Sequence, residues 1–561
     1  MEVPNPIGHI IISADRPARP DEFWITIDNP EAGLEVGSII VAEGDNRRVV
    51  GVVDTIEHAS RSSSVSQWYE HRVEGSRAIE PSVRYPVEQY ARVRVLARDP
   101  PVKSPPSGRW TVRHMMAKDA NVLFKRIPEH HRILAGFFKG RELVPIYLHA
   151  QFLLGPEGAH INITGKTGLA TKTSYAVFLA HAILSWARRT GERVAVVMFN
   201  VKRGDLMRLH IRPKDMEEAT RRLEIWAGEM GMSEYAPLMV KLWEKAVEEG
   251  LDPFNTRIRY FTYSGDQFCD WGHGDVVRYF YGLGNLTPGE VIAAIYSPGE
   301  KVPDTQRNML YTYFDALGDR MVSFDEMRSH FRQYADYRPE AAERYNLYRE
   351  GLPRIGRWRT DVADAIYRRL DGFLRRATHV VIRDRPVGNP IRFRKLGEGM
   401  INVVQLFGLD EAEKRLVVNA LLREILVGLQ RRREERHLDR VFVFVDELNV
   451  YAPRAESPIK EQVLEIVARG RDLYLSLCGA QQFASQVDSQ VYGNCSTKVV
   501  GNSDFAEIES GIYRFLGGFK SIVPYLDKGE MIIYHPLYAS PVPVIFPVPL
   551  HEVMGEAGVA P

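Results

Sequence analysis

Lys172 and Thr173 follow a short apolar run and a glycine-containing turn, and their types and spacing suggest chemistry. A phosphate-binding loop uses backbone N–H groups at a helix N-terminus, a lysine that reaches the terminal phosphates and a hydroxyl ligand for Mg²⁺. Lys172 and Thr173 fit the last two roles. The residues that we expect around a nucleotide are Gly165, Thr167, Gly168, Ala170, Thr171, Lys172, Thr173 and Ser174.

The loop departs from the pattern Gly-x-x-x-x-Gly-Lys-Ser/Thr. Gly165 lies seven residues before Lys172 instead of six, and Thr171 stands where the second glycine is expected. Lys166 also follows a glycine, but it comes directly after the strand and leaves no residues to wrap a phosphate. We therefore rank Lys172 first and Lys166 second. The alternative is an ordinary β-to-α turn that carries two polar lysines.

Two adjacent acids, Asp446 and Glu447, end a strongly apolar run at residues 440–445. Such a run predicts a strand inside a parallel sheet. At its carboxyl end Asp446 would bind Mg²⁺ together with Thr173, and Glu447 would polarise the attacking water in phosphoryl transfer. A solvated turn or a helix cap is the alternative, and the loop upstream favours an ATPase.

Residues 467–482 contain an arginine pair before an apolar strand that ends in two amides. Arg471, with Arg469 in reserve, is the candidate for an arginine finger, which adds positive charge in the transition state and is commonly supplied by a neighbouring subunit. Gln481 is the candidate sensor of the γ-phosphate. Arginines before a strand are more often simply solvated, so this interpretation depends on the other two motifs.

The elements that must position these residues form an α/β fold. Residues 1–100 hold short β-rich runs broken by turns, including a hairpin signal at residues 43–46, and they predict a small β-barrel. Residues 101–150, which begin in a Pro-rich linker, lead into the core. We expect a RecA-like core in two parts, 151–204 and 381–540, separated by a mainly helical insertion at 205–380 and followed by a Pro-rich tail at 541–561. The expected core strands include residues 194–199, 400–406 and 441–445, and residues 260–263 could form one more strand inside the insertion. Asp410 and Glu413 fit a capping box at the start of a helix over 410–429.

Composition excludes several classes of protein. The chain has 561 residues, 45% hydrophobic and 26% charged, which is typical of folded soluble proteins. Three cysteines are too few for a disulfide framework or a four-thiolate zinc site. The sequence shows neither a signal peptide nor an apolar run long enough to span a bilayer, so we expect a cytoplasmic protein without membrane contact.

Four segments follow one another in the order and spacing of a known family of motors: residues 164–174, residues 199–202, the acids Asp446 and Glu447, and residues 469–482. They resemble the HerA and FtsK branch of RecA-like hexameric DNA motors, and within it bacterial HerA-type proteins. The β-rich front is similar to the HAS barrel of HerA proteins. Asn200 is a departure, because many HerA proteins carry Asp at this position.

This resemblance implies a homo-hexamer with ATP and Mg²⁺ between subunits and double-stranded DNA in a central channel. It implies a translocase or helicase that works with a separate nuclease of the NurA type, or with another effector such as a sirtuin-like NADase, in DNA end processing or antiphage defence. The alternative is a nucleotide-gated scaffold that activates its effector with little translocation.

Two basic segments suit a polyanion. Residues 375–395 carry seven Lys and Arg side chains against Asp384 alone, and residues 202–205 form a second possible channel loop. Cations beside a flexible turn bind phosphates without reading bases. A solvated hairpin or a subunit contact is the alternative for both.

Overall fold

The computed structural model describes residues 6–60, 87–108, 110–140, 142–166, 172–204, 206–297, 300–337, 353, 358–431, 438–455, 457 and 459–554. The chain divides into two compact units. One unit comprises residues 1–149 and 499–547, and the other comprises residues 150–498 and 548–561. Among the described helices, none combines the length and the hydropathy needed to cross a membrane.

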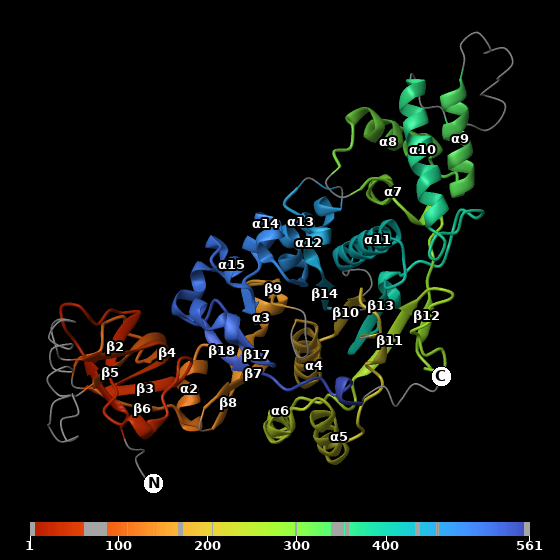
Figure 1. Ribbon diagram of the computed structural model, residues 1–561. Helices are drawn as coiled ribbons and strands as arrows, with labels where there is room; N and C mark the ends of the chain where they lie inside the picture. The colour runs from red at the N-terminus through yellow and green to blue at the C-terminus, as the bar shows by residue number, and fades with distance from the viewer. Residues whose placement is uncertain are drawn as a thin grey trace, which may run out of the picture. The chain divides into compact units, whose positions relative to one another are not determined.

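The first unit begins with a closed six-stranded barrel in the order β1-β2-β5-β4-β3-β6, drawn in red and orange in Figure 1. Asp45 and Asn46 join β3 to β4 with positive φ angles, as a two-residue hairpin turn requires, so the predicted hairpin is confirmed. Apolar side chains such as Phe23 and Val93 fill the interior. The strands are β1 (Gly8–Ile11), β2 (Glu22–Thr26), β3 (Ile39–Gly44), β4 (Arg47–Ser60), β5 (Val87–Asp99) and β6 (Thr111–His114).

A second set of strands in this unit was not predicted in full. The antiparallel hairpin of β7 (Arg132–Lys139) and β8 (Leu143–His149) lies in residues 101–150, for which no strand was predicted. Strand β18 (Val542–Ile545) lies in the segment expected to be a tail, and it pairs with β17 (Glu530–Tyr534) and β7. The boundary between the two units, at residues 498 and 499, falls inside strand β16 (Thr497–Val500).

The second unit contains a parallel sheet in the order β12-β11-β13-β10-β14-β15-β9. Every residue of β9, β10 and β13 is buried, as expected for strands covered on both faces. The predicted α/β fold with a preceding β-barrel is confirmed. The strands are β9 (Ile161–Thr164), β10 (Val194–Asn200), β11 (Arg257–Thr262), β12 (Val276–Arg278), β13 (Met400–Gln405), β14 (Arg440–Asp446) and β15 (Leu475–Gln481).

Helices cover both faces of this sheet. Helix α4 (Lys172–Thr190) lies on one face with α5 (Met216–Glu229) and α6 (Ala236–Glu248), and α11 (Glu411–Gln430) and α13 (Lys460–Arg469) lie on the other (Figure 1). This division follows from right-handed crossovers that run in opposite directions along the sheet. The predicted capping box of α11, formed by Asp410 and Glu413, is present.

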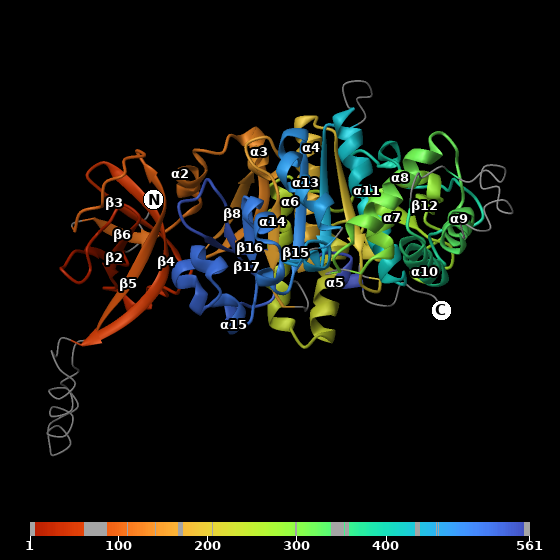
Figure 2. The same ribbon diagram turned by 90° about the horizontal axis from the view of Figure 1, so that it is seen from above.

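The segment expected to be a helical insertion is mixed. Strand β11, which we expected as one more strand, and β12 extend the core sheet beyond β13. Helices α9 and α10 lie side by side in both ribbon views (Figures 1 and 2). The helices here are α7 (Pro288–Ile295), α8 (Asp304–Leu317), α9 (Phe324–Asp336) and α10 (Thr360–Arg376).

Candidate functional site

The candidate site lies at the carboxyl ends of the parallel strands of the second unit. Strands β9 and β14 are separated only by β15, and β10 is the other neighbour of β14. Because all these strands run in the same direction, the residues that follow them meet at one edge of the sheet. The motif residues at the carboxyl ends of these four strands therefore come together in space.

Lys172 begins α4 and is buried. Its Nζ donates a hydrogen bond to the backbone oxygen of Gly165, at 2.8 Å, so the first glycine of the loop and the preferred lysine are in contact. Burial lowers the pKa of Lys172, and the positive charge of Lys202 acts in the same direction, whereas Asp446 and Glu447 oppose the shift. Lys166, the second choice, is exposed.

Four of the predicted nucleotide contacts lie outside the described residues. They are Thr167, Gly168, Ala170 and Thr171, so only the two ends of the loop, Gly165 and Lys172, are placed. Ser174 is described, and its hydroxyl donates to Glu552 Oε1 at 2.7 Å. Glu552 begins the turn η14 (Glu552–Met554), so a residue from the last part of the chain contacts the start of α4.

Thr173 and Asp446 are neighbours although 273 residues separate them. The hydroxyl of Thr173 donates to Asp446 Oδ2 at 3.4 Å. Asp446 is buried, and a small pocket beside it is also lined by Phe199, Asn200 and Lys202. Mg²⁺ prefers oxygen ligands, and protein sites often provide one or two of them beside the phosphates of a substrate. The two oxygen atoms therefore fit a magnesium nucleotide.

Among the described residues, no group of three or more His, Cys, Asp and Glu side chains could hold a metal ion. A metal at Thr173 and Asp446 would therefore need further oxygen ligands from a bound nucleotide or from water. This is the way in which Mg²⁺ is commonly held in nucleotide-hydrolysing sites, because it keeps several waters and binds substrate phosphates.

Glu447 has a left-handed backbone conformation, with φ +54° and ψ +49°, at the start of the short helix α12 (Leu448–Tyr451). Non-glycine residues adopt this conformation rarely, and it is found where a turn must aim a side chain. Its N–H donates to Asp446 Oδ1 at 3.0 Å, which fixes the two acids relative to each other. The half-exposed carboxylate of Glu447 remains accessible to a water molecule.

Lys202 was predicted as part of a channel loop, but the structure places it at the two acids. Its Nζ lies 2.7 Å from Asp446 Oδ2 and 3.8 Å from Glu447 Oε1. The sequence did not indicate this role, since Lys202 lies two residues beyond β10 in a turn of ordinary polar composition. The only signal was its place after a buried strand of the same sheet.

Gln481 ends β15, and its side chain is completely buried. Its Nε2 donates to Asn162 Oδ1 at 2.7 Å and to Thr164 Oγ1 at 3.3 Å, while its Oε1 accepts from Asn162 Nδ2 at 3.2 Å. The amide is therefore bound to β9, the strand that enters the loop. A role as γ-phosphate sensor stays a prediction, and Asn162 is a partner that the sequence analysis missed.

Arg471 lies at the opposite edge of the sheet, in the turn η10 (Gly470–Leu473) before β15. The seven residues of β15 span about 23 Å at 3.3 Å per residue, so Arg471 does not reach the acids of its own chain. Its side chain is exposed and lies 3.5 Å from Asp472, and Arg469 pairs with Glu465. Any contact of Arg471 with a nucleotide would require a second chain.

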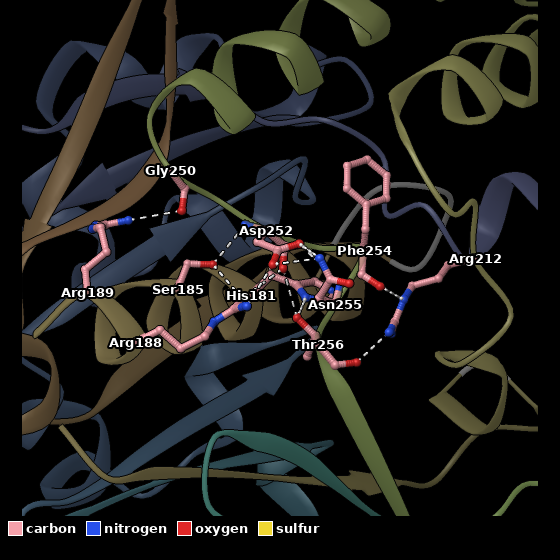
Figure 3. A network of polar contacts seen from close by, with 10 residues as sticks. All are labelled: His181, Ser185, Arg188, Arg189, Arg212, Gly250, Asp252, Phe254, Asn255 and Thr256. Atoms are coloured by element: carbon pink, nitrogen blue, oxygen red, sulfur yellow. Dashed lines mark hydrogen bonds and ion pairs between the residues drawn. The ribbon is translucent and has the colours of Figure 1, made fainter. Parts of the chain in front are cut away.

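A polar network anchors α4, which carries Lys172 and Thr173, at its other end (Figure 3). Arg188 donates to Asp252 Oδ2 at 2.7 Å, and Ser185 accepts from the Asp252 N–H at 3.0 Å. His181, which is buried, lies 2.9 Å from Thr256 Oγ1, and burial lowers its pKa to about 3. The helix is thus fixed to residues 250–256, just before β11.

The basic segment at residues 375–395 is largely paired within the chain. Arg383 and Arg392 lie 2.9 and 3.3 Å from the carboxylates of Asp325 and Glu424. Lys395 donates to two oxygens of its own turn. Arg385 and Arg394 are exposed and form no ion pair with the described residues. The remaining pairs are Arg375 with Asp371 and Arg376 with Asp410.

No protein-family model and no curated protein matches this sequence. The structure is similar to the unbound bacterial conjugative coupling protein TrwB, with 11% identity, a TM-score of 0.42, and coverage of 72% of this chain and 87% of that chain. For TrwB with the ATP analogue ADPNP the identity is 12%, the TM-score is 0.43, and the match covers 70% of this chain and 86% of that chain. For VirB4 of Thermoanaerobacter pseudethanolicus the identity is 13%, the TM-score is 0.41, and the match covers 76% of this chain and 99% of that chain. With TM-scores below 0.5, these three similarities assign no activity to this chain.

Proposed function

We propose that this chain is a Mg²⁺-dependent ATPase whose site is formed by Lys172, Thr173, Asp446 and Glu447. The observation that carries this proposal is the 3.4 Å contact between Thr173 Oγ1 and Asp446 Oδ2. Two motifs that the sequence assigns to the same magnesium ion lie far apart in the chain, and they meet at the carboxyl edge of a parallel sheet, where α/β proteins bind ligands.

Each residue has a distinct task in this proposal. The Lys172 ammonium neutralises the terminal phosphates, and Thr173 and Asp446 hold the metal ion. When bound, Mg²⁺ neutralises phosphate charge and orients the phosphate oxygens. Glu447 accepts a hydrogen bond from the attacking water and orients it, and Gln481 is positioned by Asn162 at the same edge. Phosphoryl transfer depends mainly on such positioning and charge neutralisation.

We infer that the active form is a ring, which the resemblance to HerA-type motors describes as a homo-hexamer around double-stranded DNA. The position of Arg471 supports a site completed by a neighbour, because the arginine lies about one strand length from the acids of its own chain. In this proposal the motor works with a separate nuclease or another effector in DNA end processing or antiphage defence.

A nucleotide-gated scaffold is the second candidate. The observation that favours it is the pairing of the basic segment, because Arg375, Arg376, Arg383 and Arg392 all lie near carboxylates of their own chain. Cations that are already paired release fewer counterions from DNA and bind it less strongly. Such a ring would activate its effector with little translocation.

ATP hydrolysis by the purified protein, measured with and without duplex DNA, tests both candidates. Strong stimulation by duplex DNA supports the motor, and equal rates support the scaffold. Absence of hydrolysis under all conditions, with no binding of a fluorescent ATP analogue, contradicts the ATPase itself. Mass measurement of the protein with and without ATP and DNA reports whether the ring forms and what it requires.

A further inference from the structure

Lys202 contacts the carboxylate that binds Mg²⁺ in the proposed ATPase. Its ammonium lies 2.7 Å from Asp446 Oδ2, the same oxygen that accepts the hydrogen bond of Thr173. The Lys202 side chain is 36% exposed, whereas the Asp446 side chain is 3% exposed. The lysine therefore approaches a buried carboxylate from the side that is open to solvent.

The turn that carries Lys202 is held by Asn200, at the end of β10. Asn200 Nδ2 donates to the backbone oxygen of Arg203 at 3.0 Å, and its Oδ1 accepts from the N–H of Leu206 at 3.4 Å. Both halves of the amide are used within the turn. An aspartate would have no donor for the Arg203 oxygen, so Asn200 suits this turn.

A second contact fixes Asn200 to the next strand. Its Nδ2 also donates to Gln405 Oε1 at 2.7 Å, and Gln405 Nε2 donates to both oxygens of the buried Asp266, at 3.1 and 3.2 Å. The backbone below Lys202 is therefore fixed by a buried polar network, while its long side chain extends toward the acids. The backbone at Lys202 is thus held in place, while its ammonium group can move on a long side chain.

A buried carboxylate without a counter-charge is costly, and a paired one is much less so. In the ligand-free protein Lys202 provides that charge. A magnesium ion bound to the same Asp446 oxygen would repel the ammonium, because two cations cannot share one oxygen at these distances without a large Coulomb cost. Lys202 and Mg²⁺ therefore compete for one ligand atom.

We propose that Lys202 is a displaceable counter-ion of Asp446, which occupies the carboxylate in the empty site and must leave when the magnesium nucleotide binds. This inference rests on the proposed function, because it takes Asp446 as the metal ligand. Lys202 acts through Asp446 and is a positioning residue. Its displacement sets the Mg²⁺ concentration that nucleotide binding requires.

The first experiment measures binding of a fluorescent ATP analogue at increasing Mg²⁺ concentrations, in the wild type and in Lys202→Met. Removing the competitor should lower the half-saturating Mg²⁺ concentration by about fivefold, the effect of an ion pair worth about 1 kcal/mol. Lys202→Arg keeps the charge and should bind as the wild type does. Arg203→Met, at the exposed neighbouring position, is the matched control and should leave the Mg²⁺ dependence unchanged.

The second experiment needs no nucleotide and no metal ion. Lys202→Met should lower the melting temperature in the presence of EDTA, because the buried Asp446 carboxylate loses the cation that contacts it. Asp446→Asn in the same chain should restore part of this loss, so the two substitutions should not be additive. Additive effects would show that the lysine does not balance the charge of Asp446, and they would overturn the proposal.

The outcomes separate this inference from the proposed function. If the wild type binds the analogue with Mg²⁺ and Lys202→Met requires the same Mg²⁺ concentration, the inference is wrong and the ATPase stands. If the wild type binds no analogue at any Mg²⁺ concentration, the proposed function is wrong and the inference falls with it.

Discussion

The two edges of the parallel sheet in the second unit use their charges differently. At the amino edge the charges form separate pairs: Arg440 with Glu192 at 3.0 Å, and Arg193 with Asp439 at 2.7 Å. At the carboxyl edge two side chains, Thr173 and Lys202, contact the same oxygen of Asp446. At the amino edge each of these carboxylates has its own arginine, whereas at the carboxyl edge two side chains share one buried carboxylate oxygen.

This difference shows where a ligand can gain binding energy. Separate ion pairs at a surface contribute little and change little when a ligand approaches. A buried carboxylate is costly without a cation, so in our proposal a metal ion takes the place of Lys202 at Asp446 and the carboxylate is never left unpaired. In this proposal the ionic contacts at the carboxyl edge change when a ligand binds, and the ion pairs at the amino edge do not.

The largest predicted effect contrasts one acid from each edge. Glu447→Gln removes the group that orients the attacking water and should lower turnover on the order of 10⁴-fold, with ATP binding retained. Lys172→Ala should likewise abolish hydrolysis. Glu192→Gln, at the amino edge, should hydrolyse ATP at the wild-type rate. Steady-state hydrolysis and equilibrium binding of an ATP analogue measure these changes. Full activity of Glu447→Gln would contradict the assignment of the site.

Arg471 is an exception to this difference between the edges, because it lies at the amino edge and we nevertheless expect it to be needed for turnover. Arg471→Ala should reduce hydrolysis about 10³-fold, as expected when an arginine finger is lost. Mixing this variant with Glu447→Gln should restore some activity, since some interfaces then combine an intact arginine with an intact acid. Hydrolysis assays over a range of mixing ratios provide the measurement. No rescue at any ratio would contradict a role across subunits.

The amino edge should also contain an acid-sensitive group. His160, the residue before β9, is buried, and its Nδ1 accepts a hydrogen bond from the Leu477 N–H at 3.0 Å, so protonation of Nδ1 breaks this contact. Burial, opposed by the Val467 carbonyl and assisted by Arg471, lowers the pKa of His160 to about 4. Between pH 6.5 and 4 the unfolded chain therefore binds the proton more readily than the folded chain, and stability falls as the pH falls.

The expected loss from His160 is about 1.4 kcal/mol per pH unit within that window. His160→Asn, which tolerates the positive φ of this position, should show a smaller dependence. Urea unfolding at pH 7, 6 and 5 measures the difference. Equal slopes in the variant and the wild type would indicate that other groups carry the pH dependence.

The smallest predicted effect concerns Asn162, which binds the Gln481 amide. Asn162→Ala leaves the buried Gln481 donors and acceptor with fewer partners and should cost about 1–3 kcal/mol of unfolding free energy. Asn494→Ala removes an exposed amide that also makes one hydrogen bond, at 2.8 Å, and should cost much less. Urea unfolding at neutral pH compares the two. Equal costs would show that the Asn162 network is not buried as described.

Sequence patterns predicted the elements where the chain is strongly periodic. The apolar runs that became β10, β13 and β14 were predicted to within a few residues, because strands buried on both faces require nearly continuous apolar sequence. The hairpin of β7 and β8 and the strand β18 were not recognised. Pro145 and Pro543 lie inside these elements, and proline in a short run argues against a strand.

The sequence indicated the candidate residues of the site, but it did not indicate which of them contact one another. Lys172, Thr173, Asp446 and Glu447 were selected from residue type and spacing alone. Lys202 was assigned to a different function, because a lysine in a turn has no local signal that distinguishes a surface charge from the partner of a buried acid. Its contact with Asp446 depends on which strand lies beside β14.

The sequence by itself determined the apolar strands, the helix that begins at Lys172 and the polar residues at the strand ends, since these follow from local periodicity and residue chemistry. Only the tertiary structure decided which strand ends lie together. The order β10-β14-β15-β9 brings Lys202, Asp446, Gln481 and Thr173 to one edge. Strand order is set by packing and crossover connections between distant segments, and no local pattern encodes it.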